Sequence, residues 1–278
     1  MSCLEGKFTL TRMKEMAQSP FRGVPLRQKL SAVLLVGGIG TRLRPILPSK
    51  PKPLAPIGEV PFLELLILQL RSQGIRRLVL CTGFQTQQIE EAFGDGHKWN
   101  VAIEYSIESH PLGTAGALKN AEKFLSEDSD FLVMNGDSFL ETDFHQLIRF
   151  HRERGGWATI AVRRVEDAAR YGTVEVDGQN RVVRFSEKLG VQSPGLVNGG
   201  IYVFKREVLQ SLQEGPASLE MDVLPKLIQH GTFAIGQAGM FIDIGTPEDY
   251  TRAQALHQRL SKAAMSTPRF GPLEDVRR

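Results

Sequence analysis

Hydrophobic and polar positions alternate along the first half of the chain with two distinct periods. Short runs rich in Val, Ile and Leu predict buried strands, and apolar residues three and four apart predict amphipathic helices. Strands are predicted at Ser31–Val36, Arg77–Cys81, Val101–Ile107 and Phe131–Met134, and helices at Phe62–Gln73, Thr86–Phe93 and Thr114–Leu125. This alternation of strand and helix predicts a mainly parallel sheet with helices on both faces.

After Asp143 the pattern changes, because several short strands follow one another without helices between them. Asp177-Gly178 is a strong hairpin signal between two of these strands. The predicted strands are Trp157–Val162, Thr173–Val176, Val182–Ser186, Val197–Phe204, Phe233–Ile235 and Met240–Ile244, and the helices are Phe144–Arg154, Glu207–Leu212, Leu219–Gln229 and Pro247–Arg259. The fold class is therefore α/β, with a Rossmann-like mixed, mainly parallel sheet flanked by helices and a small antiparallel portion.

The two ends of the chain lack this periodicity. We expect residues 1–29 to form a loosely ordered N-terminal arm, or to lie upstream of a later start at Met13 or Met16. Residues 30–261 are predicted to form the functional domain, with Thr246 as the N-cap of its last helix. Residues 262–278 are predicted to be a C-terminal tail.

Composition and charge exclude several classes of protein. No apolar run has the length of a membrane span, residues 1–29 lack the apolar core of a signal peptide, and two cysteines predict no disulfide framework. A reducing, cytoplasmic setting is expected. The net charge is +3, but residues 1–30 and 252–278 each hold six Lys or Arg against two acids, so the body is negative. A negative body argues against nucleic-acid binding.

A glycine-rich loop directly follows the first predicted strand. It contains Gly37, Gly38 and Gly40, then Thr41 and Arg42, and Lys52 follows in a segment rich in proline. Glycines let a backbone approach a ligand closely, and exposed N–H groups at such a turn bind anions. Two nearby cations indicate a phosphate chain, so we expect a nucleoside triphosphate as ligand.

Two well-known phosphate loops do not fit this segment. A P-loop requires a lysine directly after its last glycine, and none follows Gly40. A dinucleotide fingerprint requires a third glycine where Leu43 stands. The remaining alternative is a turn that only ends a strand.

Two aspartates lie where a divalent metal would need ligands. Asp137 follows the strand at 131–134 through Asn135-Gly136, and Asp243 stands between Ile242 and Ile244. An aspartate at an apolar strand end needs a hydrogen bond, an ion pair or a metal. Taken singly, Asp137 fits a turn cap and Asp243 a buried salt bridge; together with the glycine loop they favour a shared Mg²⁺.

An ordered set of motifs now shows a resemblance that no single motif carries. The set runs from about Ser31 to Tyr250 and consists of Gly37-Gly38-Ile39-Gly40-Thr41-Arg42-Leu43 with Pro51-Lys52-Pro53, Leu112-Gly113-Thr114-Ala115-Gly116-Ala117, Asn135-Gly136-Asp137, Glu187-Lys188, Asn198-Gly199-Gly200 and Asp243-Ile244-Gly245-Thr246-Pro247. It resembles the sugar-1-phosphate nucleotidylyltransferases. Within that family it is most similar to the D-glycero-D-manno-heptose 1-phosphate guanylyltransferases, with mannose-1-phosphate guanylyltransferases as the nearest alternative.

The resemblance implies a reaction in which an NTP, here GTP, and a sugar 1-phosphate give an NDP-sugar and pyrophosphate for bacterial surface glycans. It implies that Arg42 steadies the leaving phosphates and Lys52 the phosphates at the reaction centre. Asp137 and Asp243 would hold Mg²⁺. These four are the expected catalytic residues, and no nucleophilic side chain is needed because the attacking phosphate is already anionic.

Binding residues follow from the same resemblance. The loop residues Gly37, Gly38, Gly40 and Thr41 would cradle the triphosphate, and Glu108 and Gly113 would contact the base, although Glu108 also fits a helix-entry carboxylate. Those expected at the sugar phosphate are Gly172, Glu187, Lys188, Asn198 and Gly199.

Other functions stay open at this point. A thymidylyl- or uridylyltransferase would use the same chemistry, and a non-catalytic regulator could keep the fold while binding a sugar nucleotide. The regulator is disfavoured because Arg42, Lys52 and both aspartates are present. A Rossmann oxidoreductase is disfavoured by the missing third glycine. The oligomeric state is not predicted.

Overall fold

The computed structural model describes residues 30–186, 190, 192–266 and 268. The predicted N-terminal arm and most of the predicted tail lie outside these residues. Within them, one mixed sheet of nine strands forms the centre of the molecule. The predicted α/β class, with a mostly parallel sheet flanked by helices, is confirmed.

The parallel part of the sheet comes from the first half of the chain. Its order is β5-β4-β1-β6, and all three pairings are parallel. The strands are β1 (Ser31–Leu35), β4 (Arg77–Thr82), β5 (Ala102–Ile107) and β6 (Asp130–Asn135). Because β1 and β6 are parallel neighbours, with Leu35 beside Asn135, the loops that follow them leave the same edge of the sheet.

The second half of the chain adds antiparallel strands, as predicted. The long strand β11 (Gly195–Lys205) pairs antiparallel with β6 on one side and with β8 (Ala158–Val165) on the other. β9 (Thr173–Val176) and β10 (Val182–Ser186) form the predicted hairpin, and β12 (Thr232–Gly236) runs parallel to β8.

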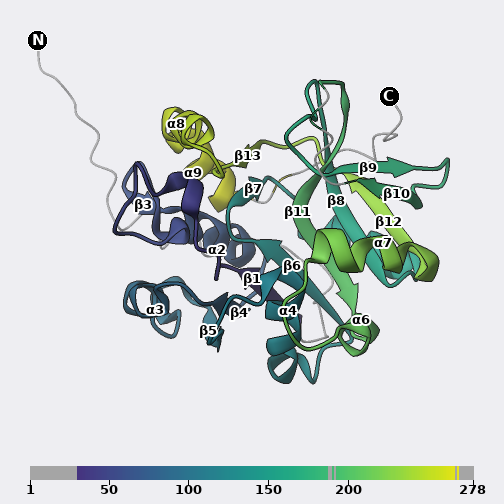
Figure 1. The fold of residues 1–278 in the computed structure, drawn as a ribbon, viewed down its shortest axis with the longest axis horizontal. Helices are drawn as coiled ribbons and strands as arrows, with labels where there is room; N and C mark the ends of the chain where they lie inside the picture. The colour runs from purple at the N-terminus through teal and green to yellow at the C-terminus, as the bar shows by residue number, and fades with distance from the viewer. Residues whose placement is uncertain (1–29, 187–189, 191, 267, 269–278) are drawn as a thin grey trace, which may run out of the picture.

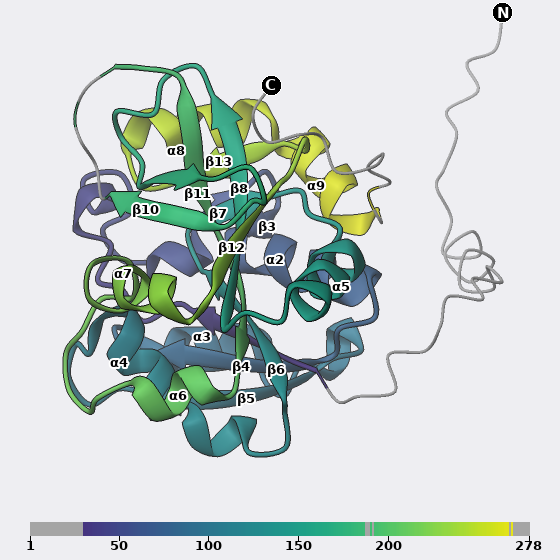
Figure 2. The ribbon, with the colours of Figure 1, turned by 90° about the vertical axis from the view of Figure 1, so that its right-hand side faces the viewer.

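Helices cover both faces because alternate residues of each strand point to opposite sides. On one face, Ala32 and Leu34 pack with α2 (Phe62–Ser72), α3 (Thr86–Phe93), α5 (Phe144–Arg154) and α9 (His257–Met265). On the other, Val33 packs with α4 (Gly113–Asn120), α6 (Glu207–Ser211) and α7 (Leu224–Leu227). Figure 2 shows α4, α6 and α7 on one side of the strands and α5 and α9 on the other.

Two predicted helices are interrupted in the structure. The helix predicted at Leu219–Gln229 consists of a π-helical turn (Leu219–Val223), α7 and a 3-10 turn. Pro225 has no N–H for the bond that an unbroken α-helix would require. Likewise, a 3-10 turn at Glu122–Leu125 follows α4 where one helix was predicted.

The last predicted helix, Pro247–Arg259, was wrong as a single element. It is divided at Leu256 into α8 (Pro247–Ala255) and α9, which continues to Met265. The predicted N-cap is confirmed, since Thr246 accepts a hydrogen bond from the Asp249 N–H. These C-terminal helices pack beside α2 and the short hairpin of β2 (Pro56–Ile57) and β3 (Val60–Pro61) (Figure 1). There the Tyr250 hydroxyl donates to the Pro56 carbonyl.

A small two-stranded sheet completes the fold. β7 (Ser138–Leu140), which was not predicted, pairs antiparallel with β13 (Phe241–Asp243). None of the helices in the described residues is long and apolar enough to cross a membrane.

Candidate active site

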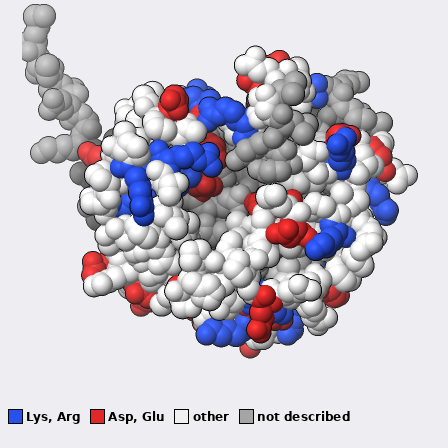
Figure 3. All heavy atoms as spheres, in the orientation of Figure 1, with Lys and Arg blue, Asp and Glu red and all other residues white. Residues whose placement is uncertain are grey.

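A cavity of about 780 Å³ opens at the carboxyl ends of β1 and β6. Its size is typical of a small-molecule site. Figure 3 shows the corresponding hollow, with Lys and Arg side chains gathered on one rim. The predicted site residues that line it are Gly37, Gly38, Gly40, Thr41, Arg42, Lys52, Glu108, Gly113, Asp137, Gly172, Asn198 and Asp243.

The glycine loop takes its shape from two close contacts. An added Cβ at Gly37 would lie 2.5 Å from Glu108 Oε1, and Gly40 has φ +64° with the Lys52 Cβ 3.1 Å from the position of its missing Cβ. Side chains at these positions would displace Glu108 or strain the turn. The loop therefore lies against the residues with which it forms the cavity wall.

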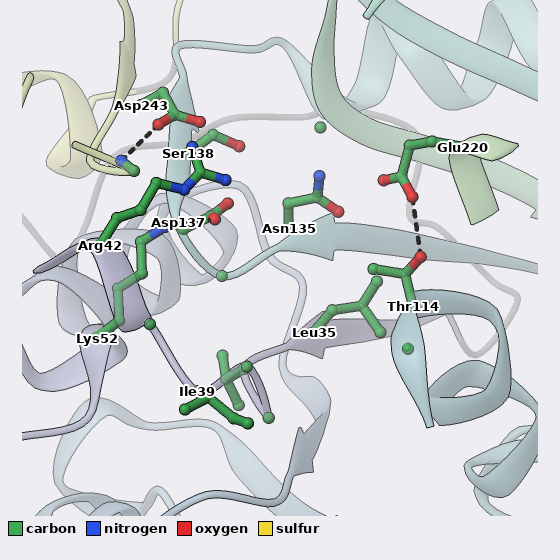
Figure 4. A pocket seen from close by; sticks show the side chains of 18 of the residues that line it. Leu35, Ile39, Arg42, Lys52, Thr114, Asn135, Asp137, Ser138, Glu220 and Asp243 are labelled. Carbon is green, nitrogen blue, oxygen red and sulfur yellow. Dashed lines mark hydrogen bonds and ion pairs between the residues drawn. The ribbon is translucent and has the colours of Figure 1, made fainter. Parts of the chain in front are cut away.

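The two aspartates are brought together by the pairing of β7 with β13. Asp243 stands opposite Ser138 in this ladder, and the Ile244 N–H donates to the Asp137 carbonyl at 2.9 Å. The Gly245 N–H in turn donates to Asp243 Oδ1 at 2.5 Å. In Figure 4 the side chains of Asp137, Asp243, Lys52 and Arg42 gather on the same side of the pocket.

Lys52 offsets only part of the repulsion between the two carboxylates. Lys52 Nζ lies 2.6 Å from Asp137 Oδ2. Burial, with the negative charge of Asp137 next in importance, raises the pKa of Asp243 to about 6, while Lys52 and the Gly245 N–H oppose the shift. A further cation near both carboxylates would relieve this repulsion.

The donor set fits magnesium. Asp137 and Asp243 lie together on one wall of the cavity, and the described residues contain no group of three or more His, Cys, Asp or Glu side chains that could hold a metal ion. Mg²⁺ typically takes one or two protein carboxylates and completes its shell with water and substrate phosphate oxygens. Asp137 and Asp243 are the residues that would hold it.

Arg42 differs from Lys52 in having no partner within the described part of the chain. It lines the cavity from the 3-10 turn Thr41–Leu43, is exposed, and makes no hydrogen bond or ion pair with a described residue. A guanidinium offers a fork of donors that suits phosphate. The geometry thus leaves this cation available to an anion in the cavity.

Glu108 lies beside the glycine loop at Gly37, whereas Lys52 lies beside it at Gly40. Glu108 Oε2 accepts the Leu112 N–H at 2.9 Å, at the entry to α4, while its Oε1 faces Gly37. Burial raises the pKa of Glu108, opposed by the Leu112 hydrogen bond and by His110. The helix-entry contact is therefore present, and the second oxygen remains beside the cavity. Gly113, with φ +68°, lines the cavity next to it.

Asn198 lines the cavity from β11, at an irregularity of that strand between Asn198 and Ile201. Its N–H donates to the Gly172 carbonyl at 2.9 Å, and its Nδ2 donates to the Tyr202 hydroxyl at 2.6 Å. Gly199 is not among the described lining residues, because it faces Leu140 and the Ala161 carbonyl; Gly200, with φ +72°, lines the cavity instead. The predicted pair Glu187 and Lys188 lies outside the described residues.

Some cavity residues were missed by the sequence analysis. Asn135 Oδ1 and Ser138 Oγ are buried without a hydrogen-bond partner among the described residues, and both line the cavity. The Asn135-Gly136-Asp137 motif was a usable signal for the first. Glu220 and Thr114 are joined by a hydrogen bond on the far wall (Figure 4). Thr114 lies in the motif at 112–117, but Glu220 carried no signal, because a single acidic residue in a helical pattern is usually a surface group.

The lining residues restrict the chemistry. Among the described residues, no Cys or His lines the cavity, so neither of these common nucleophiles and bases is at hand. Cations and loop N–H groups are suited to positioning phosphates and neutralising their charge. The carboxylate pair would contribute by holding a divalent metal ion.

Comparison with known proteins shows which sequences and structures this chain resembles. A family model described as nucleotidyl transferase matches residues 31–259. The chain is 38% identical to the mannose-1-phosphate guanylyltransferase of Mycobacterium tuberculosis over 231 residues, 82% of this chain and 64% of that protein. It is also 38% identical to the D-glycero-alpha-D-manno-heptose 1-phosphate guanylyltransferase of Aneurinibacillus thermoaerophilus over 228 residues, 81% of this chain and 97% of that protein.

Solved structures show the same fold. HddC from Yersinia pseudotuberculosis, in complex with GMP-PN, aligns with a TM-score of 0.73 and 34% identity over 81% of this chain and 98% of that chain. A putative glucose-1-phosphate thymidylyltransferase from Bacillus anthracis aligns with a TM-score of 0.75 over 87% of this chain and 98% of that one, and at 23% identity it supports the fold alone.

Proposed function

The chain belongs to the nucleotidyl transferase family, and on this premise we propose that it transfers a guanylyl group from GTP to a sugar 1-phosphate. The preferred acceptor is D-glycero-D-manno-heptose 1-phosphate, and the products are a GDP-sugar for surface-glycan assembly and pyrophosphate. The proposal places the enzyme in the cytoplasm, a reducing compartment in which the buried free thiol of Cys81 is retained.

One observation carries the proposal. Arg42, Lys52, Asp137 and Asp243 converge on one wall of a cavity that has no Cys or His among its described lining residues. A phosphate oxygen that is already anionic needs no base to attack the α-phosphorus. Catalysis then rests on holding two phosphate groups in line and neutralising their charge.

Each group of residues has a part in that task. The N–H groups of the loop 37–41 bind the triphosphate and fix its direction. In this proposal Arg42 binds the β- and γ-phosphates that leave as pyrophosphate. Lys52, which Asp137 holds at 2.6 Å, binds the phosphates at the reaction centre. Mg²⁺ bound by Asp137 and Asp243 would supply charge neutralisation between phosphate oxygens.

Similarity to known proteins supports guanine as the base of the nucleotide and heptose 1-phosphate as the acceptor. The two relatives at 38% identity are a heptose 1-phosphate and a mannose-1-phosphate guanylyltransferase, and HddC was solved with GMP-PN. The chain spans 97% of the heptose relative but 64% of the mannose relative. Mannose 1-phosphate is the second candidate acceptor because the two identities are equal.

A substrate panel tests the proposal. The purified chain is combined with GTP, ATP, UTP or dTTP and with heptose 1-phosphate, mannose 1-phosphate or glucose 1-phosphate, and pyrophosphate release is recorded with Mg²⁺. We expect the fastest release from GTP with heptose 1-phosphate. Faster turnover of dTTP or UTP would contradict the guanylyl assignment, and no release from any pair would contradict the enzyme itself.

A further inference from the structure

A polar network on the wall opposite Arg42 and Lys52 has no part in the mechanism so far. Its centre is Glu220, in the π-helical turn Leu219–Val223, which lines the cavity. Glu220 Oε2 accepts hydrogen bonds from Thr114 Oγ1 at 2.9 Å and from Ser218 Oγ at 3.1 Å. Figure 4 shows Glu220 and Thr114 across the pocket from the charged group of Arg42, Lys52, Asp137 and Asp243.

The second oxygen of Glu220 is poorly satisfied. Among the described residues, Oε1 accepts only the Tyr202 hydroxyl, at the long distance of 3.4 Å, and no cation there forms an ion pair with Glu220. A carboxylate has about four acceptor positions. This partly buried side chain therefore keeps acceptor capacity beside the cavity, where a ligand with strong donors would lie.

The charge of Glu220 limits the chemistry of that ligand. A phosphate would be repelled by the carboxylate, and the cations for phosphates lie on the other wall (Figure 4). The fitting donor is a neutral hydroxyl group, as a sugar supplies. Hydrogen bonds from a hydroxyl to an ionised carboxylate are among the stronger ones in proteins.

The network also indicates that this hydroxyl belongs to the transferred sugar and not to the ribose of the nucleotide. The Tyr202 hydroxyl that donates to Glu220 accepts from Asn198, and the Asn198 N–H donates to the Gly172 carbonyl. Asn198 and Gly172 are the described residues expected at the sugar phosphate. We propose that Glu220 is a specificity-determining residue whose Oε1 accepts a hydrogen bond from a hydroxyl of the transferred sugar. This inference rests on the proposed function.

Local backbone irregularities accompany the network at both ends. Glu220 projects from a π-helical turn, and Asn198 from an irregularity in β11. Both kinds of irregularity frequently occur at functional sites, because each re-aims a side chain. Here they place Glu220 and Asn198 on either side of the buried Tyr202.

The test compares two substitutions in the same turn. Glu220→Gln keeps the shape, and its amide oxygen can still accept from Thr114 and Ser218, so an NH₂ group replaces Oε1. Asp222→Asn is the matched control, since Asp222 accepts the Ser218 N–H, is exposed and does not line the cavity. Melting temperatures of both variants should stay close to that of the wild type.

We expect Glu220→Gln to raise KM for the sugar 1-phosphate by about tenfold or more, with KM for GTP within about twofold, because an accepting charge is lost at one hydroxyl. Mannose 1-phosphate or heptose 1-phosphate, whichever turns over faster, is then compared with its monodeoxy derivatives. One derivative should be used equally well by wild type and Glu220→Gln, and that derivative identifies the hydroxyl. Asp222→Asn should match the wild type.

Three outcomes would overturn the inference alone: unchanged kinetics in Glu220→Gln, a rise in KM for GTP in place of the sugar phosphate, or an equal loss with every derivative. The second would assign Glu220 to the ribose, and the third to structure. Wild-type protein without pyrophosphate release from any substrate pair would instead overturn the proposed function and this inference with it.

Discussion

At the scale of single residues, the two cations of the site differ in how firmly the protein holds them. Lys52 is held by Asp137 at 2.6 Å, so its position is fixed before substrate binds. Arg42 has no partner among the described residues and is exposed. Preorganised charge of the first kind requires little rearrangement in the transition state, whereas the second would find its partner only in an anion bound in the cavity.

Arg42→Ala should lower kcat/KM by about a hundredfold, as loss of a group that stabilises transition-state charge does. The melting temperature should not change, since Arg42 contacts no described residue through a hydrogen bond or ion pair. Arg44→Ala is the control: Arg44 lies over the Phe84 ring at 4.9 Å and is not among the lining residues. Equal activity of the two variants, measured by pyrophosphate release, would remove Arg42 from the mechanism.

Asp243 gives the site a pH dependence. Its pKa of about 6 in the folded chain exceeds the ordinary aspartate value of 3.8, so the metal-free folded state binds the proton more tightly than the unfolded state. Stability without metal should therefore fall as pH rises from about 4 to 6. Mg²⁺ bound at this carboxylate would compete with the proton, so its affinity should rise over the same range and level off above it.

Calorimetric titration with Mg²⁺ at pH 5, 6 and 7, at about one-unit steps around the raised pKa, measures this effect. In Asp243→Asn the pH dependence over this range should disappear together with most of the affinity. A wild-type affinity that is the same at all three pH values would show that Asp243 does not exchange a proton for the metal.

At the scale of elements, two loops must leave neighbouring strands at one edge of the sheet. Gly136 makes this possible, because an added Cβ would lie 2.5 Å from Val36 Cγ1 and 2.6 Å from the Leu35 carbonyl oxygen. The Gly136 N–H also donates to that carbonyl at 3.0 Å. The ends of β1 and β6 are thus packed backbone against backbone, directly before Asp137.

Gly136→Ala should destabilise the fold by about 2 kcal/mol, in the range of overpacked core substitutions, because backbone atoms must shift. Gly38→Ala is the control for stability, since nothing lies within 4 Å of its missing Cβ. Urea denaturation of both variants measures the difference. Equal stability of the two would mean that β1 and β6 are not packed as closely as described.

Periodicity predicted most elements of the parallel half correctly, because buried strands and amphipathic helices there have distinct patterns. It missed β7, since Ser138–Leu140 is only three residues long and its partner β13 comes from more than a hundred positions later. The division at Leu256 was also missed: the apolar positions continue through it, and only tertiary packing shows the change of direction.

At the scale of the whole molecule, the site is assembled from both halves of the chain. The parallel half supplies the loop 37–42 and Asp137, and the antiparallel half supplies Asn198, Glu220 and Asp243. The resemblance of ordered motifs predicted the residues of the charged wall. It did not indicate Glu220, because its role follows from contacts with Thr114 and Tyr202 that only the folded chain brings together.

The most direct test of the whole account is a crystal structure with a non-hydrolysable GTP analogue and Mn²⁺ in place of Mg²⁺, with the metal located by its anomalous scattering. The account predicts one metal at about 2.1 Å from a carboxylate oxygen of both Asp137 and Asp243, the distance that small octahedral cations adopt. It also predicts the triphosphate along residues 37–42. A metal away from these carboxylates, or a nucleotide bound outside the cavity, would contradict it.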